Sequence, residues 1–566
     1  SNGSSAGPSG FSPDMIKQLS GKKDKLNESF STALLKVVNI ILTGNIPSRI
    51  SKYFSGATLI ALIKPDQGVR PIAIGEVIRR ICGKVAMRSM KDNLFDTFGD
   101  LQYGVNVPNG CEAIVHSLCA HLQEGSFENN VLLKTDWSNA FNTIDRSNLF
   151  NLVREFAPKI SKFVESCYLN NPELFYFDNI IESANGVQQG DPLAPYLFCL
   201  IQQKIIKSVQ DKFNLIYNKW YMDDGNMIVS LDLVDVILDF IASEGSKVGL
   251  VLNIRKCEIW APNLNQQLQS SPLEQPVLSA VKFNSASGII VLGGPISIDP
   301  HFFKVFLSEK ICQIVIIIES IKKLDNCQNQ LLLLRSCVAY PQLGYHIRVC
   351  PTQFILEELE LYDNIIRETI AIIIGGSLDN IAKQQLMLPI NEGGLGFQSL
   401  SKTAVSAFLA SITQSFLILK TQPRKDFAVV GEMYSVMSNS PVESLSISNL
   451  SQMPKPQKFL SQPIRNLDVL AFEQAISNSP DCERLQAHWN SVKQNISTKV
   501  FSASPANNYR QIGTQVFAAM VRNLLAISSV ELSELEQRKC SFCTTMLSIN
   551  CTHDIDCKLN GVTRRH

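Results

Sequence analysis

The sequence predicts an α+β protein in which strands and helices alternate to about residue 300 and helices fill most of the remainder. Short β-branched runs that end at turn signals predict the strands of the first half. Beyond Phe302, long Leu- and Ile-rich segments broken at prolines have the spacing of helices. A chain of 566 residues is too long for one core and should divide into roughly three or four domains.

Individual elements follow from local patterns. We expect a helix from Asp24 to Leu42, two strands between Ala57 and Ile74, a helical segment over 76–97 and a strand at Val131–Thr135. The turn between the first two strands is Lys64-Pro65-Asp66-Gln67-Gly68. Two polar, proline-containing stretches are predicted as a loop or insertion (263–276) and as a linker (438–463).

Composition favours a folded protein, with 45% hydrophobic and 18% charged residues. The longest apolar runs fall short of the roughly 20 residues that a membrane helix needs, so no membrane partner is expected. Fifteen irregularly spaced Cys indicate reduced thiols inside a cell.

Two segments bring carboxylates to strand ends. Tyr221-Met222-Asp223-Asp224-Gly225 lies between apolar runs, and such an Asp-Gly sequence predicts a hairpin with two adjacent acids at its tip. Asp136 directly follows the strand Val131–Thr135. Carboxylate oxygens suit Mg²⁺, and two such ions can activate a hydroxyl and stabilise a leaving pyrophosphate. Taken separately, each segment is also compatible with an ordinary turn or a helix cap.

Over roughly residues 50–300, these segments resemble, in order and spacing, the motifs of reverse transcriptases. Asp136 with Phe141 resembles the first palm motif, Gly186–Leu193 the second, and Tyr221–Asp224 the YxDD box. The resemblance implies a right-hand polymerase with fingers, a palm built on an antiparallel sheet, and a helical thumb. It also implies two Mg²⁺ ions, or Mn²⁺, held by Asp136, Asp223 and Asp224.

The same resemblance assigns substrate contacts. Phe141 would lie under the incoming sugar and favour dNTPs, while Lys64 and Arg70 would hold the triphosphate. Lys256, in a segment similar to the fourth palm motif, would assist the departure of pyrophosphate. The remaining expected contacts to template and nucleotide are Gln188, Gln189, Gly190, Tyr221 and Met222.

The chain ends in a Cys/His segment whose spacing suits a tetrahedral Zn²⁺ site. The predicted ligands are Cys540, Cys543, His553 and Cys557, with Cys551 as a substitute. This segment is similar to those of non-LTR retroelement proteins in which a restriction-like endonuclease follows. The segment Leu388–Gly396 also resembles sequence that flanks the polymerase of such elements, although Met222 replaces the Ala that they more often have.

The expected organisation has five parts: an N-terminal extension and helix (1–50), fingers and palm (51–300), a thumb (301–400), a helical nucleic-acid-binding or linker region (401–535), and a zinc segment (536–566). The expected function is an RNA-directed DNA polymerase of a retrotransposon that acts in the nucleus. Its partners would be an RNA template, a DNA primer or target DNA, and dNTPs. The alternatives are an RNA-dependent RNA polymerase and a domesticated protein that binds nucleic acid without catalysis.

A net charge of +1 requires any phosphate-binding surface to be local. Clusters of basic residues are the candidates for such a surface, although they are equally well explained as solvated faces. The candidates are Arg79-Arg80 with Lys84 and Arg88, Lys22-Lys23 with Lys25, and Arg564-Arg565.

Overall fold

The computed structural model describes residues 4–20, 25–64, 67–91, 94–270, 280–419, 424–439, 447–493, 501 and 512–527. The chain divides into two compact units. The first comprises Ser1–Ile114 and Glu124–Leu292, and the second Val115–Gln123 and Gly293–His566. This two-way division does not test the five-part organisation expected from the sequence.

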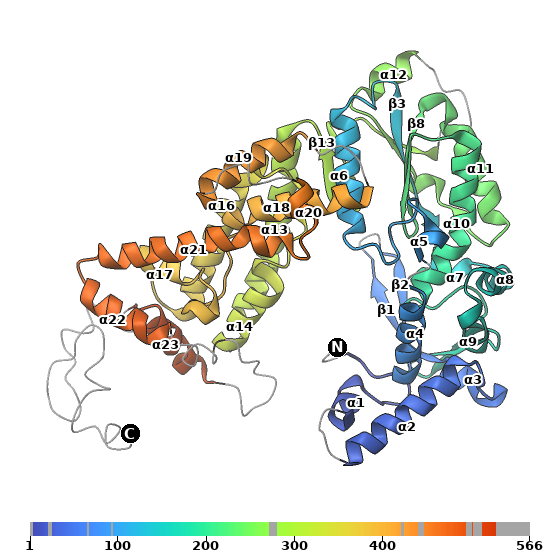
Figure 1. Ribbon diagram of the computed structural model, residues 1–566, viewed down its shortest axis with the longest axis horizontal. Helices are drawn as coiled ribbons and strands as arrows, with labels where there is room; N and C mark the ends of the chain where they lie inside the picture. The colour runs from blue at the N-terminus through green and yellow to red at the C-terminus, as the bar shows by residue number, and fades with distance from the viewer. Residues whose placement is uncertain are drawn as a thin grey trace. The chain divides into compact units, whose positions relative to one another are not determined.

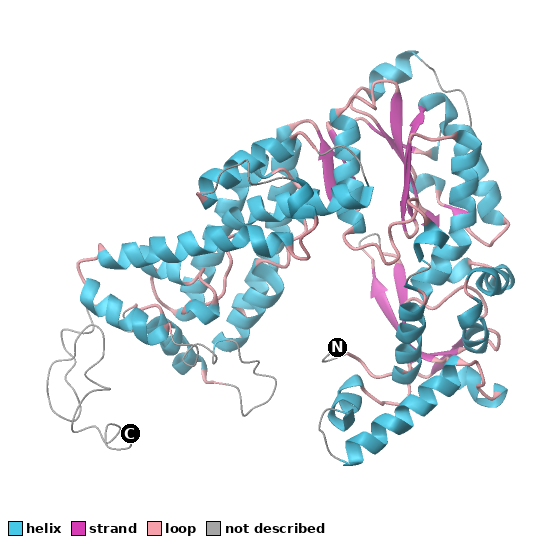
Figure 2. Ribbon diagram, in the orientation of Figure 1, coloured by secondary structure: helices cyan, strands magenta, loops and turns pink. Residues whose placement is uncertain are grey.

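The first unit is mixed α and β, as the strands in Figure 2 show. Its helices are α1 (Pro13–Ser20), α2 (Lys25–Leu42), α3 (Ser48–Phe54), α4 (Val77–Ser89), α5 (Leu94–Phe98), α6 (Gly110–Gln123, counted with the second unit from Val115), α7 (Ala140–Thr143), α8 (Arg146–Phe156), α9 (Pro158–Tyr168), α10 (Ala194–Phe213), α11 (Val234–Ser246) and α12 (Leu264–Ser270). Its strands are β1 (Ala57–Ile63), β2 (Val69–Gly75), β3 (Asn130–Thr135), β4 (Trp137–Ser138), β5 (Glu173–Tyr176), β6 (Asn179–Glu182), β7 (Tyr217–Tyr221), β8 (Asp224–Ser230), β9 (Val251–Leu252), β10 (Glu258–Trp260), β11 (Lys282–Asn284) and β12 (Gly288–Val291).

One sheet of this unit has four strands in the order β2-β1-β5-β6. Strands β1 and β2 pair antiparallel from Ala57 opposite Gly75 to Ile63 opposite Val69. The predicted hairpin is therefore confirmed, and the amide of Lys64 closes its turn by donating to the Gly68 carbonyl.

A second sheet has five strands in the order β11-β10-β3-β8-β7. The apolar residues of β3 are fully buried, which fits a central strand covered on both faces. Helix α10 packs against α11 and α8, and Figure 1 shows α10 and α11 beside this sheet. Trp220 and Leu133 join α10 residues such as Phe198 in one hydrophobic core. The predicted strand before Asp136 and the predicted hairpin are both confirmed, although the turn of the hairpin is Met222-Asp223 and Gly225 lies within β8.

In its described residues the second unit is helical apart from strand β13 (Gly294–Ser297), as predicted for the chain beyond Phe302. Its helices are α13 (Pro300–Lys322), α14 (Cys327–Leu333), a π-helical turn (Leu334–Ala339), α15 (His346–Val349), α16 (Thr352–Ile374), α17 (Asn380–Gln385), α18 (Leu400–Leu419), α19 (Asp426–Ser438), α20 (Ile447–Ser451), α21 (Pro456–Ser477), α22 (Cys482–Val492) and α23 (Thr514–Leu524). Short 3₁₀ turns complete both units at Leu231–Leu233, Ile254–Lys256 and Ile390–Glu392.

Helix ends in the second unit follow local chemistry. Helix α13 starts with Pro300, and the Asp299 side chain accepts a hydrogen bond from the amide of His301. Helix α16 ends at Gly375, whose φ of 62° is left-handed. Helix α18 lies at the centre, because α15, α16, α19, α20 and α21 all contact it.

Two sequence predictions are wrong where the structure describes the residues. The stretch at 263–276, predicted as a loop or insertion, contains α12 in its described part, so it is not a loop there; the Gln267 side chain ties this helix to the carbonyls of Phe127 and Glu128. The predicted linker at 438–463 contains α20 and the start of α21, with Pro463 inside the helix. Burial of Leu460 and Ile464 in a hydrophobic core offsets the hydrogen bond that Pro463 cannot make. Within the described ranges, no helix combines the length and hydropathy of a membrane span.

Candidate functional site

Three carboxylates meet at one edge of the five-stranded sheet. Strands β3 and β8 pair with Thr135 opposite Gly225, so one step further along this register Asp136 comes opposite Asp224. Asp223 precedes Asp224 in the turn between β7 and β8. Strand pairing thus brings together the three acids that the sequence singled out, although almost ninety positions separate Asp136 from Asp223.

The protonation behaviour of these acids reflects their closeness. Burial raises the pKa of Asp136 and of Asp223. Burial, followed by repulsion from Asp223 and Asp136, raises the pKa of Asp224 to about 6. Asp224 is exposed at the hairpin tip, while the protein around it still excludes much of the water from its carboxylate. A cluster of this kind is stabilised by cations.

The cationic side chains that are expected to hold the triphosphate lie close enough to the acids to lower their pKa values. Lys64, at the end of β1, lowers the pKa of both Asp136 and Asp223, and Arg70, on β2, lowers that of Asp223. Lys256 also lowers the pKa of Asp136. The hairpin cations and Lys256 therefore lie near enough to the acids to influence their protonation.

The turn that presents Asp223 is held by a residue that the sequence analysis missed. Met222 has a left-handed φ of 51°. The buried Gln102 side chain fixes this turn, because its Oε1 accepts from the Met222 amide at 2.8 Å and its Nε2 donates to the Met222 carbonyl at 3.1 Å. The amide of Gly104 and the side chain of Gln202 complete its hydrogen bonds. Gln102 lies in no predicted element, so no local signal could have identified it.

The segment Gly186–Leu193 runs against strand β2. The Ala73 amide donates to the Gln189 carbonyl at 2.7 Å. Gly190 has a φ of 119°, and a Cβ there would lie 2.4 Å from the Ala73 carbonyl oxygen, so only glycine allows this approach. The strand that bears Arg70 and the loop expected to support the template base are therefore fixed to each other.

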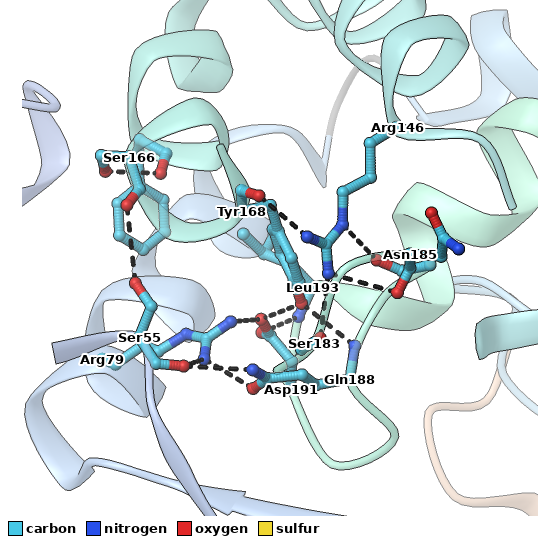
Figure 3. Close-up of polar contacts among 12 residues, drawn as sticks. Ser55, Arg79, Arg146, Ser166, Tyr168, Ser183, Asn185, Gln188, Asp191 and Leu193 are labelled. Carbon is cyan, nitrogen blue, oxygen red and sulfur yellow. Dashed lines mark hydrogen bonds and ion pairs between the residues drawn. The ribbon is translucent and has the colours of Figure 1, made fainter. Parts of the chain in front are cut away.

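A buried arginine anchors this loop from the side (Figure 3). Arg79 on α4 forms an ion pair with Asp191 at 2.7 Å and donates to Gln188 Oε1 at 2.6 Å and to the Ser55 carbonyl. Tyr168 donates from its hydroxyl to the same carboxylate at 2.6 Å. Burial alone would lower the pKa of Arg79, but Asp191 raises it above its ordinary value.

These contacts correct two expectations. Arg79 was predicted as part of a basic surface, but only 2% of it is exposed and its charge is neutralised by Asp191. Gln188 was expected to offer its amide to substrate, but that amide already bonds to Arg79 and to the Ser55 carbonyl. Both side chains instead shape the loop, while Gln189 is only partly buried and Gly190 is exposed.

The start of the loop has its own anchor. Arg146, the first residue of α8, donates to the carbonyls of Gly186 and Tyr168 and to the hydroxyl of Ser183. Figure 3 shows it on the opposite side of Tyr168 from Arg79. Both arginines hold the loop and both contact the Tyr168 ring. Each guanidinium lies 5.2 Å from the centre of that ring.

Two aromatic residues complete the predicted set. Phe141, on α7, is half-buried and stacks on Phe198 with ring centres 4.7 Å apart. This contact fixes its ring against helix α10. Tyr221 shares a hydrogen bond with Cys111, and burial raises the pKa of its hydroxyl to about 12, so it stays neutral.

Comparison with known proteins identifies the first unit. Residues 62–291 match the family described as "Reverse transcriptase (RNA-dependent DNA polymerase)". These residues form a reverse transcriptase domain. The α+β fold expected from the sequence is confirmed for this domain, and at the family level the assignment implies RNA-directed DNA polymerase chemistry that uses divalent metal ions.

The reverse transcriptase domain is related to those of non-LTR retrotransposons. The matches include the "Retrovirus-related Pol polyprotein from type-2 retrotransposable element R2DM" of Drosophila melanogaster, with 26% identity over 45% of this chain and 24% of the relative. The "Retrotransposable element SLACS 132 kDa protein" of Trypanosoma brucei gambiense is 21% identical over 45% of this chain and 21% of its own length. A type-1 R2 polyprotein of Bradysia coprophila is 27% identical over 45% of this chain and 30% of its length. The chain thus spans less than a third of these relatives.

Among solved structures, apo telomerase from Candida tropicalis matches with a TM-score of 0.37 and 11% identity, covering 73% of this chain and 69% of that one. Telomerase from Candida albicans with a fragment of telomeric RNA matches with a TM-score of 0.36 and 11% identity, covering 74% and 65%. At these scores the likeness adds no argument about function.

Asp136, Asp223 and Asp224 are chemically suited to bind a divalent ion. They supply oxygen donors only, and their mutual repulsion is the kind of strain that a cation relieves. Among the described residues, no group of three or more His, Cys, Asp or Glu side chains is placed so that it could hold a metal ion by itself. Mg²⁺ commonly takes only one or two protein carboxylates and completes its shell with water and substrate phosphates, so the two observations are compatible.

The expected zinc ligands Cys540, Cys543, His553 and Cys557 lie outside the described residues. The same holds for Lys22, Lys23 and Arg564-Arg565 among the basic clusters. Sequence reasoning found the acids and cations because each has a local signal at a strand end or turn. It missed Gln102 and Tyr168, whose positions depend on contacts between distant segments.

Proposed function

We propose that the chain is an RNA-directed DNA polymerase of a retrotransposon, which adds dNTPs to the 3′-end of a primer on an RNA template. The four-stranded sheet would serve as fingers, the five-stranded sheet as palm, and helices after β13 as thumb. The observation that best supports this is the joint placement of Asp136, Asp223 and Asp224 at one sheet edge, with Lys64 and Arg70 acting on them.

In this proposal each side chain has a defined task. Asp136, Asp223 and Asp224 hold the divalent ions, which when bound would activate the primer hydroxyl and stabilise the leaving pyrophosphate. Lys64 and Arg70 orient the triphosphate through charge-assisted hydrogen bonds, and Lys256 stabilises the departing charge. Phe141 excludes a 2′-hydroxyl by steric contact. Gln189 and Gly190 support the nucleotide through the loop backbone, and Tyr221 with Met222 shapes the turn that presents Asp223.

Further parts of the proposal depend on the relatives. The chain would act in the nucleus on element RNA and target DNA, as expected of retrotransposon proteins. Residues 536–566 would bind a structural Zn²⁺ through three Cys and one His. The five-part organisation is proposed together with these roles.

The direct test is extension of a DNA primer on an RNA template by the purified chain, with dNTPs or NTPs and with Mg²⁺ or EDTA. We expect Mg²⁺-dependent incorporation of dNTPs. Phe141→Ala should reduce the preference for dNTPs over NTPs, on the order of tenfold or more, because the added space removes a steric penalty.

The rival functions give different results. Equal or better use of NTPs by the unmodified chain would indicate an RNA-copying RNA polymerase. Binding of primer and template without incorporation of either nucleotide, under all metal conditions, would indicate a nucleic-acid-binding protein that has no catalytic activity.

A further inference from the structure

The second unit contains a cavity of about 380 Å³ that the polymerase site does not use. Its walls come from α17, from the segment Leu388–Gly396, from one face each of α18 and α21, and from Arg367 on α16. The volume falls in the range typical of small-ligand sites. Leu388–Gly396 is the segment that resembles retroelement sequence and has no role in the proposed catalysis. We call this cavity the basic pocket.

Charge in the basic pocket is unbalanced. Four cationic side chains line it (Arg367, Lys383, Lys402 and Arg465), against the single acid Asp468. Lys402 forms an ion pair with Asp468, which leaves three positive charges without an acidic neighbour in the lining. Within the described part of the chain, the side chains of Lys383 and Arg465 form no ion pair. The pocket therefore favours an anionic ligand.

The segment Leu388–Gly396, which forms one wall of the pocket, is held in place by a hydrogen bond and by close backbone contacts. The buried side chain of Gln385 donates to the Gly393 carbonyl at 3.1 Å. A Cβ at Gly394 would lie 2.1 Å from the Leu388 carbonyl oxygen, and Gly396 has a left-handed φ of 74°. The loop can follow this path only with glycines, so the pocket is formed before any ligand arrives.

The rest of the lining is uncharged and combines apolar, amide and hydroxyl side chains. Met387, Leu388, Pro389 and Ile464 supply apolar surface, while Gln384 and Gln398 offer neutral donors and acceptors. A bare phosphate would not use this surface. A nucleotide would, because its base has an apolar face and polar edges and its phosphate is anionic.

A second cavity of about 450 Å³ adjoins the first. The two share Gly396, Gln398, Thr403, Ser461 and Arg465, and the second adds Arg335, Lys458 and Tyr340. Adjacent cavities lined by cations and by the partly buried ring of Tyr340 suit successive nucleotides of one strand, because bases stack on aromatic rings while cations follow the backbone.

We propose that the basic pocket and its neighbour bind a single-stranded stretch of nucleic acid, with one nucleotide seated against Leu388–Pro389 and its phosphate at Lys383 and Arg465. Arg465 lies between successive nucleotides because it lines both cavities. This function goes beyond polymerisation. The second unit would thereby bind single-stranded nucleic acid outside the site of nucleotide addition.

The test uses the full chain with its polymerase site saturated by primer and template. Binding of labelled oligo(rU), oligo(dT) and free UMP is measured for the unmodified chain, Arg465→Gln and Lys383→Gln. Lys323→Gln is the matched control, because it removes one charge from an exposed helix end of the same unit outside both cavities. A 4-thiouridine oligonucleotide locates the contact by photo-crosslinking.

We expect each pocket variant to weaken oligonucleotide binding about fivefold and to reduce the salt slope by about 0.7, the value for one lost phosphate contact on a single strand. The crosslink should map to Leu388–Gly396, and Lys323→Gln should bind as the unmodified chain does. Tighter binding of oligo(rU) or of oligo(dT) identifies the strand as RNA or DNA.

Unchanged oligonucleotide affinity in both pocket variants would overturn the proposal, as would UMP binding as tightly as oligo(rU). Lys383 is exposed, so Lys383→Gln keeps the test valid even if Arg465→Gln fails to fold. Primer extension is measured in parallel. Loss of extension with strand binding retained would contradict the proposed polymerase function and not this inference.

Discussion

At the scale of single residues, Asp224 shows the electrostatic cost of placing three carboxylates on one sheet edge. Its pKa of about 6 in the folded protein lies above the value of about 3.9 expected for an unfolded chain. The folded state therefore holds the proton more tightly. The free energy of unfolding contributed by this group falls as the pH rises from about 4 to 6, and it stays low at neutral pH.

Asp224→Asn should consequently raise the melting temperature of the metal-free protein at pH 7. Since Asp224 is partly screened by solvent, we expect about 1 kcal/mol, or a few degrees. The gain should vanish near pH 4, where the wild-type carboxyl is protonated. Calorimetry from pH 4 to 7 in EDTA measures this, with Asp211→Asn on the exposed face of α10 as the control for charge.

Mg²⁺ at pH 7 should stabilise the wild type more than Asp224→Asn, because the ion relieves the same repulsion. A melting temperature for Asp224→Asn equal to or below that of the wild type in EDTA would contradict the account of this residue.

At the scale of elements, the loop Gly186–Leu193 is tied to the four-stranded sheet and to two helices of the domain. Its backbone bonds to β2, and Arg79 on α4 and Arg146 on α8 hold its sides. The sequence predicted that this segment lies near substrate, from its glycines and amides. It could not predict which amide faces inward, because that depends on Arg79 and Ser55, which are more than a hundred positions away.

Removing the ion pair between Arg79 and Asp191 should change the KM for dNTPs as well as the free energy of unfolding. Arg79→Met leaves Asp191 buried and unpaired, so we expect a loss of about 3 kcal/mol or more. The double variant Arg79→Met/Asp191→Leu removes both charges and should regain most of this stability. Both variants should show a raised KM for dNTPs with a smaller change in kcat, since the loop and the acids would lose their relative position.

Steady-state extension and thermal unfolding of the same samples separate the two effects. The neighbouring Arg80→Met is the control, because the Arg80 side chain donates to the Ser5 carbonyl and forms no ion pair with any described residue. An unchanged KM in the stable double variant would show that the ion pair serves stability alone.

At the scale of the whole molecule, the sequence predicted the change from mixed α/β to helical structure and the approximate end of the reverse transcriptase domain. Local signals suffice for this, because strand and helix periods and turn residues change along the chain. The helices α12 and α21 were missed because tertiary contacts of Gln267, Leu460 and Ile464 outweigh polar and proline-containing sequence. The basic pocket was missed because it joins residues from several separate segments.

The central claim is that Asp136, Asp223 and Asp224 form the catalytic centre of an RNA-directed DNA polymerase. The most direct measurement compares extension rates of the wild type, Asp223→Asn and the exposed control Asp211→Asn, at saturating Mg²⁺, with primer–template affinity measured on the same samples. We expect Asp223→Asn to lower the rate by about a thousandfold or more while its affinity stays near that of the wild type, because several kcal/mol of transition-state stabilisation are lost. Extension by Asp223→Asn at the rate of Asp211→Asn would contradict the account.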